Sequence, residues 1–253
     1  MRIALVISTL GPGGAERVLS LLARAWAEEG HEVWLHTLTG PQQKPFYPLD
    51  PRVRLVPLGL APMGRGKFMA LADLIRRAWH LRQQWNRIQP DTIVSFLDMT
   101  NVLTLVSTLG TSLRTVVAER SHPGFQALSP TWEWLRARLY PFAHRVVVLT
   151  RSAGSWFPSE LQSRISIVPN PVVLPDGTPH VPRETPGGRI MAMGRLGPEK
   201  GFDILLRALS TVLPTAPDWT VQILGEGPLR PELETLRNDL GLQDKVDFFG
   251  LVP

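Results

Sequence analysis

The sequence begins with a short apolar segment, a glycine-rich loop, an amphipathic segment and a second apolar segment. Arg2–Ser8 is mostly Ile, Leu and Val, which is typical of a strand buried on both faces. The loop Thr9–Gly14 follows, and apolar residues then recur at helical spacing until Gly30, which suits a helix C-terminus. With Glu32–Leu38 as the next strand, this is a βαβ unit, which restricts the fold to a parallel sheet with packed helices. The loop opens at the carboxyl edge of the sheet, where such folds bind ligands.

The same alternation continues along the chain and predicts an α/β fold of two domains. After an extended segment at 53–56 and a long helix at 63–90, strands are expected at 91–96, 114–118, 145–149 and 165–168, and helices at 102–109, 132–143 and 151–156. Prolines crowd residues 169–188, which predicts an extended linker between a first domain, 1–168, and a second, 189–253. In the second domain we expect strands at 189–193, 219–224 and 246–249 and helices at 202–213 and 230–240. Three strands and two helices are few for an independent core, so we expect this second domain to be either small or incomplete.

Composition excludes several classes of protein. The chain of 253 residues has no cysteine, which rules out disulfides and thiolate metal sites and suits a reducing cytoplasm. No segment approaches the roughly 20 apolar residues of a membrane span, and the first apolar segment is too short for a signal peptide. The net charge of +5 indicates an anionic partner: a membrane surface, nucleic acid or a phosphorylated substrate.

The segment Gly194–Gly201, GRLGPEKG, joins a predicted strand to a predicted helix. It places Arg195 at the end of the strand and Lys200 at the start of the helix, where the free N–H groups of the first turn also point. Two cations beside a helix N-terminus suit a diphosphate group. The segment therefore predicts a site for a phosphate-bearing ligand.

The first glycine loop has two interpretations. Gly11 and Gly13 fit the dinucleotide pattern G-x-G-x-x-G, but the third position is Glu16, so the pattern fails, and no Walker motif occurs in the chain. The loop is either an ordinary tight turn or a place where a phosphate or sugar approaches the backbone closely.

Charged residues follow two of the predicted strands. Directly after the strand 114–118 comes ERSHP, in which His122 is the histidine best placed for chemistry and Arg120 is suited to positioning an acceptor. Asp98 follows the strand 91–96, and we assign it with Arg120 to the acceptor side. The alternative for His122 is a loop histidine that is hydrogen-bonded to the backbone.

The long helix at 63–90 is rich in arginine. Its apolar residues fall roughly on one face, and its basic residues lie elsewhere: Phe68, Leu71, Ile75, Trp79 and Ile88 form the first set, and Arg76, Arg77, Arg87 and His80 the second. Two interpretations remain open, a surface helix with solvated arginines or a basic amphipathic helix on an anionic membrane. In the second interpretation, Arg76, Arg77, Arg87 and Trp79 contact the membrane surface.

Five motifs together resemble one known family. These are GGAERV at 13–18, ERSHP at 119–123, PNPV at 169–172, GRLGPEKG at 194–201 and LGEGPLRPELE at 224–234. In this order they resemble the retaining glycosyltransferases of family 4, which have the GT-B fold. The resemblance spans the whole chain.

The resemblance implies two Rossmann-like domains, the first for the acceptor and the second for a nucleotide-sugar donor. Donor contacts are expected at Gly13, Gly14, Gly225, Gly227, Arg195 and Lys200, and catalytic roles at Arg195, Lys200 and His122, with His122 touching the transferred sugar. It implies no cofactor and no metal ion, transfer with retention of configuration, and a lipid-linked or polysaccharide acceptor. The resemblance also implies a location in the cytoplasm, peripherally on the inner face of the cell membrane. Nucleic acid is not an expected partner.

The sequence also departs from the family pattern. Family members carry two glutamates with seven residues between them downstream of the strand at 246–249, and neither Glu226 nor Glu232 has that place. We therefore expect residues 1–253 alone to show little or no transferase activity. The alternative is a truncated transferase that only binds an acceptor or a partner protein. The motifs disfavour a GT-B sugar-nucleotide epimerase. Glu16 at the third glycine position of G-x-G-x-x-G disfavours a nicotinamide oxidoreductase.

Overall fold

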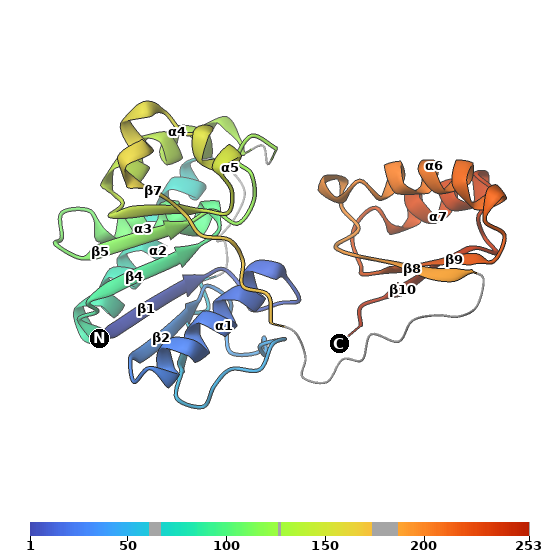
Figure 1. The fold of residues 1–253 in the computed structure, drawn as a ribbon. Coiled ribbons are helices and arrows are strands. Elements are labelled where there is room, and N and C mark those ends of the chain that lie inside the picture. Colours follow the sequence, from blue (N-terminus) through green and yellow to red (C-terminus); the bar gives the residue numbers. More distant parts are fainter. Residues whose placement is uncertain (61–66, 126–127, 174–186, 253) are drawn as a thin grey trace. The chain divides into compact units, whose positions relative to one another are not determined.

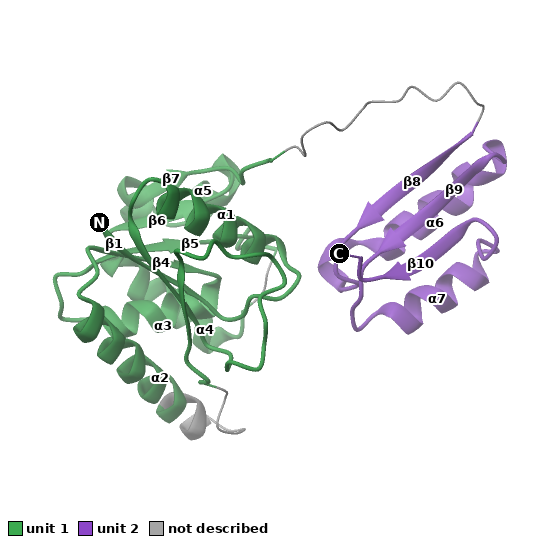
Figure 2. Cartoon of the chain, turned by 90° about the horizontal axis from the view of Figure 1, so that it is seen from below, with its two compact units in different colours: residues 1–173 green, residues 174–253 purple. Residues whose placement is uncertain are grey.

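The computed structural model describes residues 1–60, 67–125, 128–173 and 187–252, with side chains from residue 72 onward in the helix that begins at Lys67. It divides into two compact units, Met1–Val173 and Leu174–Pro253 (Figure 2). Each unit has its own sheet with helices packed against it (Figure 1). Most of the predicted proline-rich linker, from 174 to 186, lies outside the described residues.

The sheet of the first unit has seven strands in the order β3-β2-β1-β4-β5-β6-β7, and all neighbouring pairs are parallel. The strands are β1 (Arg2–Ile7), β2 (Glu32–Thr37), β3 (Arg54–Pro57), β4 (Thr92–Phe96), β5 (Arg114–Ala118), β6 (Arg145–Val148) and β7 (Ile165–Ile167). The chain builds outward from β1 to β3 and then returns to add β4 on the other side of β1. That reversal creates a topological switch point at the carboxyl edge of the sheet.

Helices cover both faces of this sheet. They are α1 (Gly14–Glu28), α2 (Lys67–Ile88), α3 (Asp98–Thr108), α4 (Pro130–Leu139) and α5 (Arg151–Ser155), with 3₁₀ segments η1 (Tyr140–Phe142) and η2 (Ser159–Arg164). In β1, Leu5 and Ile7 pack into a cluster with α1, while Ala4 and Val6 pack into another cluster with α2. The expectation of a strand buried on both faces is confirmed, since alternate side chains enter separate cores.

Helix α2 differs from its prediction in which face it buries. Its core residues are Ala78, Leu81, Trp85 and Ile88, whereas Ile75 and Trp79 are 58% and 56% exposed. The grouping of Ile88 with Ile75 and Trp79 on one face was wrong, because the step of nine positions from Trp79 to Ile88 turns the side chain by about half a circle. Residues 63–66 of the predicted helix, and the side chains of Phe68 and Leu71, lie outside the described residues.

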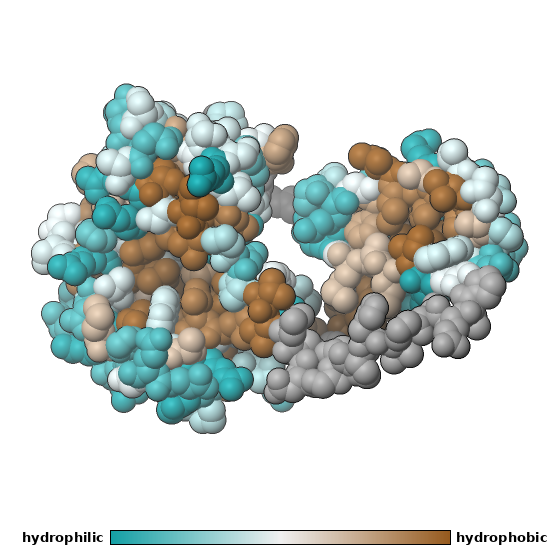
Figure 3. All heavy atoms as spheres, viewed as in Figure 1, coloured by the Kyte–Doolittle hydropathy of each residue, from teal (hydrophilic) through white to brown (hydrophobic). Residues whose placement is uncertain are grey.

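The second unit has a sheet of three parallel strands in the order β10-β9-β8. Its elements are β8 (Gly188–Met193), η3 (Pro198–Lys200), α6 (Phe202–Val212), η4 (Leu213–Thr215), β9 (Trp219–Leu224), α7 (Arg230–Asp239) and β10 (Val246–Gly250). Its core cluster joins both helices to one face of the sheet, with Leu206, Val221 and Ile223 fully buried. Exposed apolar side chains occur on both units, as Figure 3 shows for one view.

Candidate functional site

The segment Gly194–Gly201 lies between β8 and α6, as predicted. β8 ends at Met193, the turn η3 ends at Lys200, and Gly201 has φ of +65°, a left-handed conformation that favours glycine. Arg195 therefore stands at the carboxyl end of a strand and Lys200 at the start of a helix. The structure brings these two predicted donor-binding cations into one loop.

Arg195 has a partner within this loop. Its Nε donates to a carboxylate oxygen of Glu199 at 3.1 Å, and this hydrogen bond lowers the pKa of Glu199. The arginine side chain is 64% exposed, and exposed ion pairs contribute about 0–1 kcal/mol. Because the pair is weak, Arg195 can exchange Glu199 for a ligand oxygen at small cost.

Gly225 and Gly227 pack directly against the Gly194–Gly201 segment. A Cβ atom on Gly225 would overlap the carbonyl oxygen of Gly194, and one on Gly227 would overlap that of Leu196. Backbone hydrogen bonds join the two segments, from Leu196 N to Glu226 O at 3.0 Å among others. Close backbone approach thus accounts for both glycines, and their predicted contact with a donor stays a prediction.

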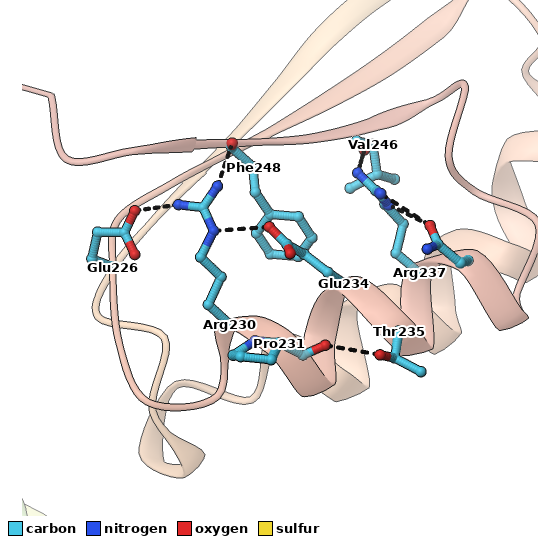
Figure 4. A network of polar contacts seen from close by, with 9 residues as sticks. Glu226, Arg230, Pro231, Glu234, Thr235, Arg237, Val246 and Phe248 are labelled. Atoms are coloured by element: carbon cyan, nitrogen blue, oxygen red, sulfur yellow. Dashed lines mark hydrogen bonds and ion pairs between the residues drawn. The ribbon is translucent and has the colours of Figure 1, made fainter.

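Arg230, which was not among the predicted site residues, connects three parts of the second unit (Figure 4). Its guanidinium pairs with Glu226, donates from Nε to Glu234 at 2.8 Å and donates from Nη2 to the carbonyl oxygen of Phe248 at 3.1 Å. One side chain at the start of α7 therefore holds the Gly225–Gly227 loop and β10 together. The LGEGPLR motif contains Arg230, but its partner Phe248 is 18 residues away, so spacing alone did not reveal the contact.

Gly13 and Gly14 lie at the N-terminus of α1, as the βαβ pattern predicts. Gly13 is the N-cap residue in an extended conformation, and Gly14 begins the helix with no atom within 4 Å of the position of a Cβ. The side chain of Glu16 lies over Gly13, and burial raises the pKa of its carboxyl group. An anion that approaches this helix N-terminus would meet an open backbone at Gly14 and a carboxylate beside Gly13.

His122 uses both of its ring nitrogens. The backbone N–H of Gly124 donates to Nδ1 at 3.1 Å, so the ring hydrogen of a neutral imidazole is on Nε2, which lies 3.2 Å from the hydroxyl of Ser152. The ring also packs against Phe125, with centroids 4.7 Å apart. The alternative of a backbone-bonded histidine is thus present in the structure, and Nε2–H is the group left to act on a ligand. Nothing in the sequence pointed to Ser152.

Arg120 and Asp98, assigned to the acceptor side, lie after neighbouring strands but make separate contacts. Arg120 donates to the side chain of Asn170, and its guanidinium lies over the ring of Phe96 with 4.9 Å to the centroid. Burial lowers the pKa of this arginine. Asp98 lies in the first turn of α3 and accepts the N–H of Met99 at 2.7 Å.

The turn before Asp98 is conformationally unusual. Leu97 has φ of +76°, which is rare for a residue with a side chain, and it follows β4, next to the switch point of the sheet. Strained residues of this kind concentrate at functional sites. The turn is therefore consistent with a site at this edge.

A buried polar network lies beneath the ERSHP segment, residues 119–123, and begins at its first residue, Glu119. Tyr140 donates to the carboxyl group of Glu119, and Asn101 donates from Nδ2 to the Tyr140 hydroxyl at 3.2 Å. The Ser95 hydroxyl extends this series of hydrogen bonds by donating to Asn101 Oδ1 at 2.8 Å. Removal from water raises the pKa of Glu119 to about 7. Sequence reasoning missed this network, because its members come from β4, α3, η1 and the residue that follows β5.

Two of the arginines of α2 form ion pairs with an aspartate of the same helix. Arg76 and Arg77 each lie 2.8 Å from a different oxygen of Asp73, whose side chain is only 11% exposed. The interpretation of these two arginines as merely solvated was therefore wrong. Arg87 is exposed, and so is Trp79, whose ring packs edge-on against His80.

Among the residues that the structure describes, no three His, Asp or Glu side chains are grouped so that they could hold a metal ion. Within the same residues, no helix is long and apolar enough to span a bilayer.

Solved structures show which class of fold this is. The chain matches HepE of Anabaena in complex with UDP-glucose with a TM-score of 0.70 at 17% identity, covering 100% of this chain and 70% of that one. It matches the lipopolysaccharide outer core galactosyltransferase WaaB with a TM-score of 0.66 at 15% identity, covering 100% and 68%. The two parallel sheets with their packed helices are those of a GT-B glycosyltransferase.

Family models and sequence relatives identify the family. The model described as Glycosyltransferase Family 4 matches residues 12–174, and the model described as Glycosyl transferases group 1 matches residues 182–253. The chain belongs to glycosyltransferase family 4, as its motifs predicted, and it is a transferase by descent. It is 29% identical over 254 residues to GalNAc-alpha-(1->4)-GalNAc-alpha-(1->3)-diNAcBac-PP-undecaprenol alpha-1,4-N-acetyl-D-galactosaminyltransferase of Campylobacter jejuni, covering 100% of this chain and 68% of the relative. An uncharacterized glycosyltransferase of Haemophilus influenzae is 23% identical, covering 98% and 68%.

Proposed function

We propose that this protein moves a sugar from a nucleotide diphosphate sugar to a lipid-linked glycan or polysaccharide precursor, with retention of configuration. The observation that carries the proposal is the placement of Arg195 and Lys200 in one loop between β8 and α6. A neighbouring structure contains UDP-glucose, and the Campylobacter relative acts on an undecaprenol-linked glycan, which supports this choice of donor and acceptor.

On the donor side, the two cations offset the negative charge that grows on the leaving diphosphate as the glycosidic bond breaks. Arg195 exchanges the carboxylate of Glu199 for a phosphate oxygen, and Lys200 and the N–H groups at the start of α6 contribute further positive potential. Loss of one such group typically costs about 3 kcal/mol of transition-state stabilisation. The proposed mechanism assigns this charge neutralisation to side chains and requires no metal ion.

In the first unit, His122 provides an Nε2–H group for the transferred sugar. This group donates to Ser152 in the structure and would donate to a sugar hydroxyl oxygen when substrate displaces that serine. Retention follows if the acceptor attacks the face that the diphosphate leaves, through an ion-paired state resembling an oxocarbenium ion. Arg120 and Asp98 lie on the same sheet edge and are proposed to position the acceptor.

The membrane proposal now rests on different residues of α2. Because Arg76 and Arg77 pair with Asp73, the side chains offered to an anionic bilayer on the inner face of the cell membrane are Trp79, Ile75 and Arg87. A tryptophan and an aliphatic residue one turn apart on an exposed face, with a basic residue nearby, suit the interfacial region.

Calorimetric titration with UDP and GDP tests the donor site, followed by a turnover assay with labelled UDP-sugars and lipid-linked acceptors. We expect one of the two nucleotides to bind, and Lys200→Ala to weaken that binding at least tenfold. Arg207→Ala removes a charge from an exposed position of α6 and is the matched control. Binding without turnover would agree with the low activity expected of residues 1–253 alone and with a binding module, and no binding of either nucleotide would refute the proposal.

A further inference from the structure

A cleft lies at the carboxyl edge of the first unit's sheet. It has a volume of about 580 Å³, within the range of about 300–1,000 Å³ that is usual for small-molecule sites. Residues that follow three neighbouring strands line it, together with one from α2: Ser8 after β1, Thr39 and Gln43 after β2, Gly59 after β3, and Arg77. The cleft is therefore located where parallel α/β folds bind ligands, and its described lining residues all belong to the first unit.

Among the described residues that line the cleft, Arg77 is the charged one, and its hydrogen bonds are incomplete. Its Nε lies 2.8 Å from Asp73 Oδ2, but neither Nε nor Nη2 makes a hydrogen bond, and both atoms are buried. The side chain as a whole is 18% exposed. Leaving a buried donor unpaired costs about 1–3 kcal/mol, and more for a charged group. Because Arg77 lines the cleft, a ligand acceptor that draws the guanidinium toward the cleft would recover that loss.

The charge around Arg77 is not balanced by Asp73. Asp73 is shared with Arg76, whose Nη2 donates to its other oxygen at 2.8 Å, so the three side chains together carry one net positive charge. Asp73 also holds the Arg77 guanidinium in place beside the cleft. A fixed guanidinium with net positive charge around it suits an anionic group with two oxygens, such as a phosphoryl group or a carboxylate.

We propose that this cleft binds an anionic group of the acceptor, with Arg77 as its principal ligand. This proposal rests on the proposed transferase function. It adds the chemistry of the acceptor, which would be a glycan or glycolipid that carries a phosphoryl group or a carboxylate. Thr39 and Gln43 add hydrogen-bonding groups that suit hydroxyls next to the anion.

The test measures binding of small anions to the full chain by calorimetry. Arg195→Ala/Lys200→Ala forms the background, since the second unit's loop would otherwise bind phosphates itself. The probes are inorganic pyrophosphate and methyl phosphate for the phosphoryl arm and glucuronate for the carboxylate arm. We expect either the phosphate probes or glucuronate to bind, and Arg77→Gln to weaken that binding at least tenfold. Arg87→Gln makes the same change on α2, roughly 15 Å along the helix, and should alter binding less than twofold.

Three outcomes would overturn the proposal: no binding of any probe, unchanged binding in Arg77→Gln, or equal losses in both arginine variants. Because Arg77→Gln breaks an ion pair, thermal unfolding must first show that the variant is folded. Asp73→Asn is the second variant; it keeps both arginines and removes the shared negative charge, so it should tighten binding at least threefold. Weaker binding in a folded Asp73→Asn protein would contradict the charge argument.

The same titrations separate this proposal from the proposed function. With Arg195 and Lys200 intact, Arg77→Gln should bind UDP or GDP as tightly as the wild type. If neither nucleotide binds while the Arg77-dependent anion site persists, the transferase proposal fails and the anion site stands. If a nucleotide binds and no anion depends on Arg77, only the anion site is refuted.

Discussion

Tyr140 donates a hydrogen bond to the carboxyl group of Glu119, and both side chains are buried in the first unit. The bond ties η1 to the end of β5, directly before the segment that holds Arg120 and His122. Because burial outweighs this hydrogen bond, the pKa of Glu119 is raised from 4.5 to about 7. The folded protein therefore keeps a proton that the unfolded chain has lost over most of this interval.

This difference predicts how stability depends on pH. Between pH 4.5 and 7 the folded state binds more protons at Glu119 than the unfolded state, so the free energy of unfolding falls as pH rises. The contribution is complete below pH 4.5, is lost as pH rises through about 7, and is on the order of 3 kcal/mol. Urea unfolding from pH 4.5 to 8 would measure it. Glu119→Gln, which stays neutral, should flatten this part of the curve; parallel curves for the two proteins would contradict the assignment.

A second prediction concerns the glycines that face the Gly194–Gly201 segment. Gly225→Ala and Gly227→Ala place a Cβ against backbone carbonyls that have no room to move, so both should weaken nucleotide binding strongly and lower stability by about 2 kcal/mol or more. Gly14→Ala is the matched control, because its Cβ would meet no atom within 4 Å. It should leave thermal stability within about 0.5 kcal/mol of the wild type. Reduced sugar transfer by stable Gly14→Ala protein would then indicate close approach of substrate, which the family resemblance predicts.

The neutral tautomer of His122 can be observed directly. Since Gly124 N–H donates to Nδ1, the hydrogen should be on Nε2, and long-range ¹H–¹⁵N NMR spectra above pH 8 should show that pattern. Ser152→Ala should not change the tautomer, because the Gly124 contact remains. A protonated Nδ1 in neutral His122 would exclude the donor role proposed for Nε2.

Arg230 provides a test of how the second unit is held together. Arg230→Ala removes contacts to Glu226, Glu234 and Phe248 and should lower the stability of the second unit, because all three contacts depend on one guanidinium group. Arg230→Lys keeps the positive charge but not the planar guanidinium with its several donors, so it should recover only part of the stability lost in Arg230→Ala. Chemical denaturation followed at the second unit would measure the change. Equal stability of Arg230→Ala and wild type would show that the network does not hold the loop.

Local patterns in the sequence predicted most of the fold, because they record burial within each segment. The strands at 2–7, 114–118 and 219–224 were recognisable from apolar runs, and GRLGPEKG indicated a strand, a turn and a helix in that order. Contacts between distant segments left no such signal. Asn101 reaches Tyr140 across 39 residues and Arg230 reaches Phe248 across 18, and neither spacing belongs to a helix or a strand. On α2, Asp73 lies three and four residues before Arg76 and Arg77, a spacing at which helical ion pairs form, so these two pairs were predictable from the sequence.

The exposed face of α2 gives the last prediction. Trp79 and Ile75 are more than half exposed one turn apart, and Arg87 lies exposed near the end of the helix. Insertion of these apolar side chains beside anionic headgroups should make the full chain co-sediment with vesicles containing phosphatidylglycerol. Trp79→Ser together with Ile75→Ser should reduce the bound fraction several-fold, and Arg87→Glu should reduce it further at low salt. Trp134→Ser, which removes an exposed tryptophan from α4, is the control. If it lowers binding as much as the α2 variants do, α2 is not the membrane-contacting helix.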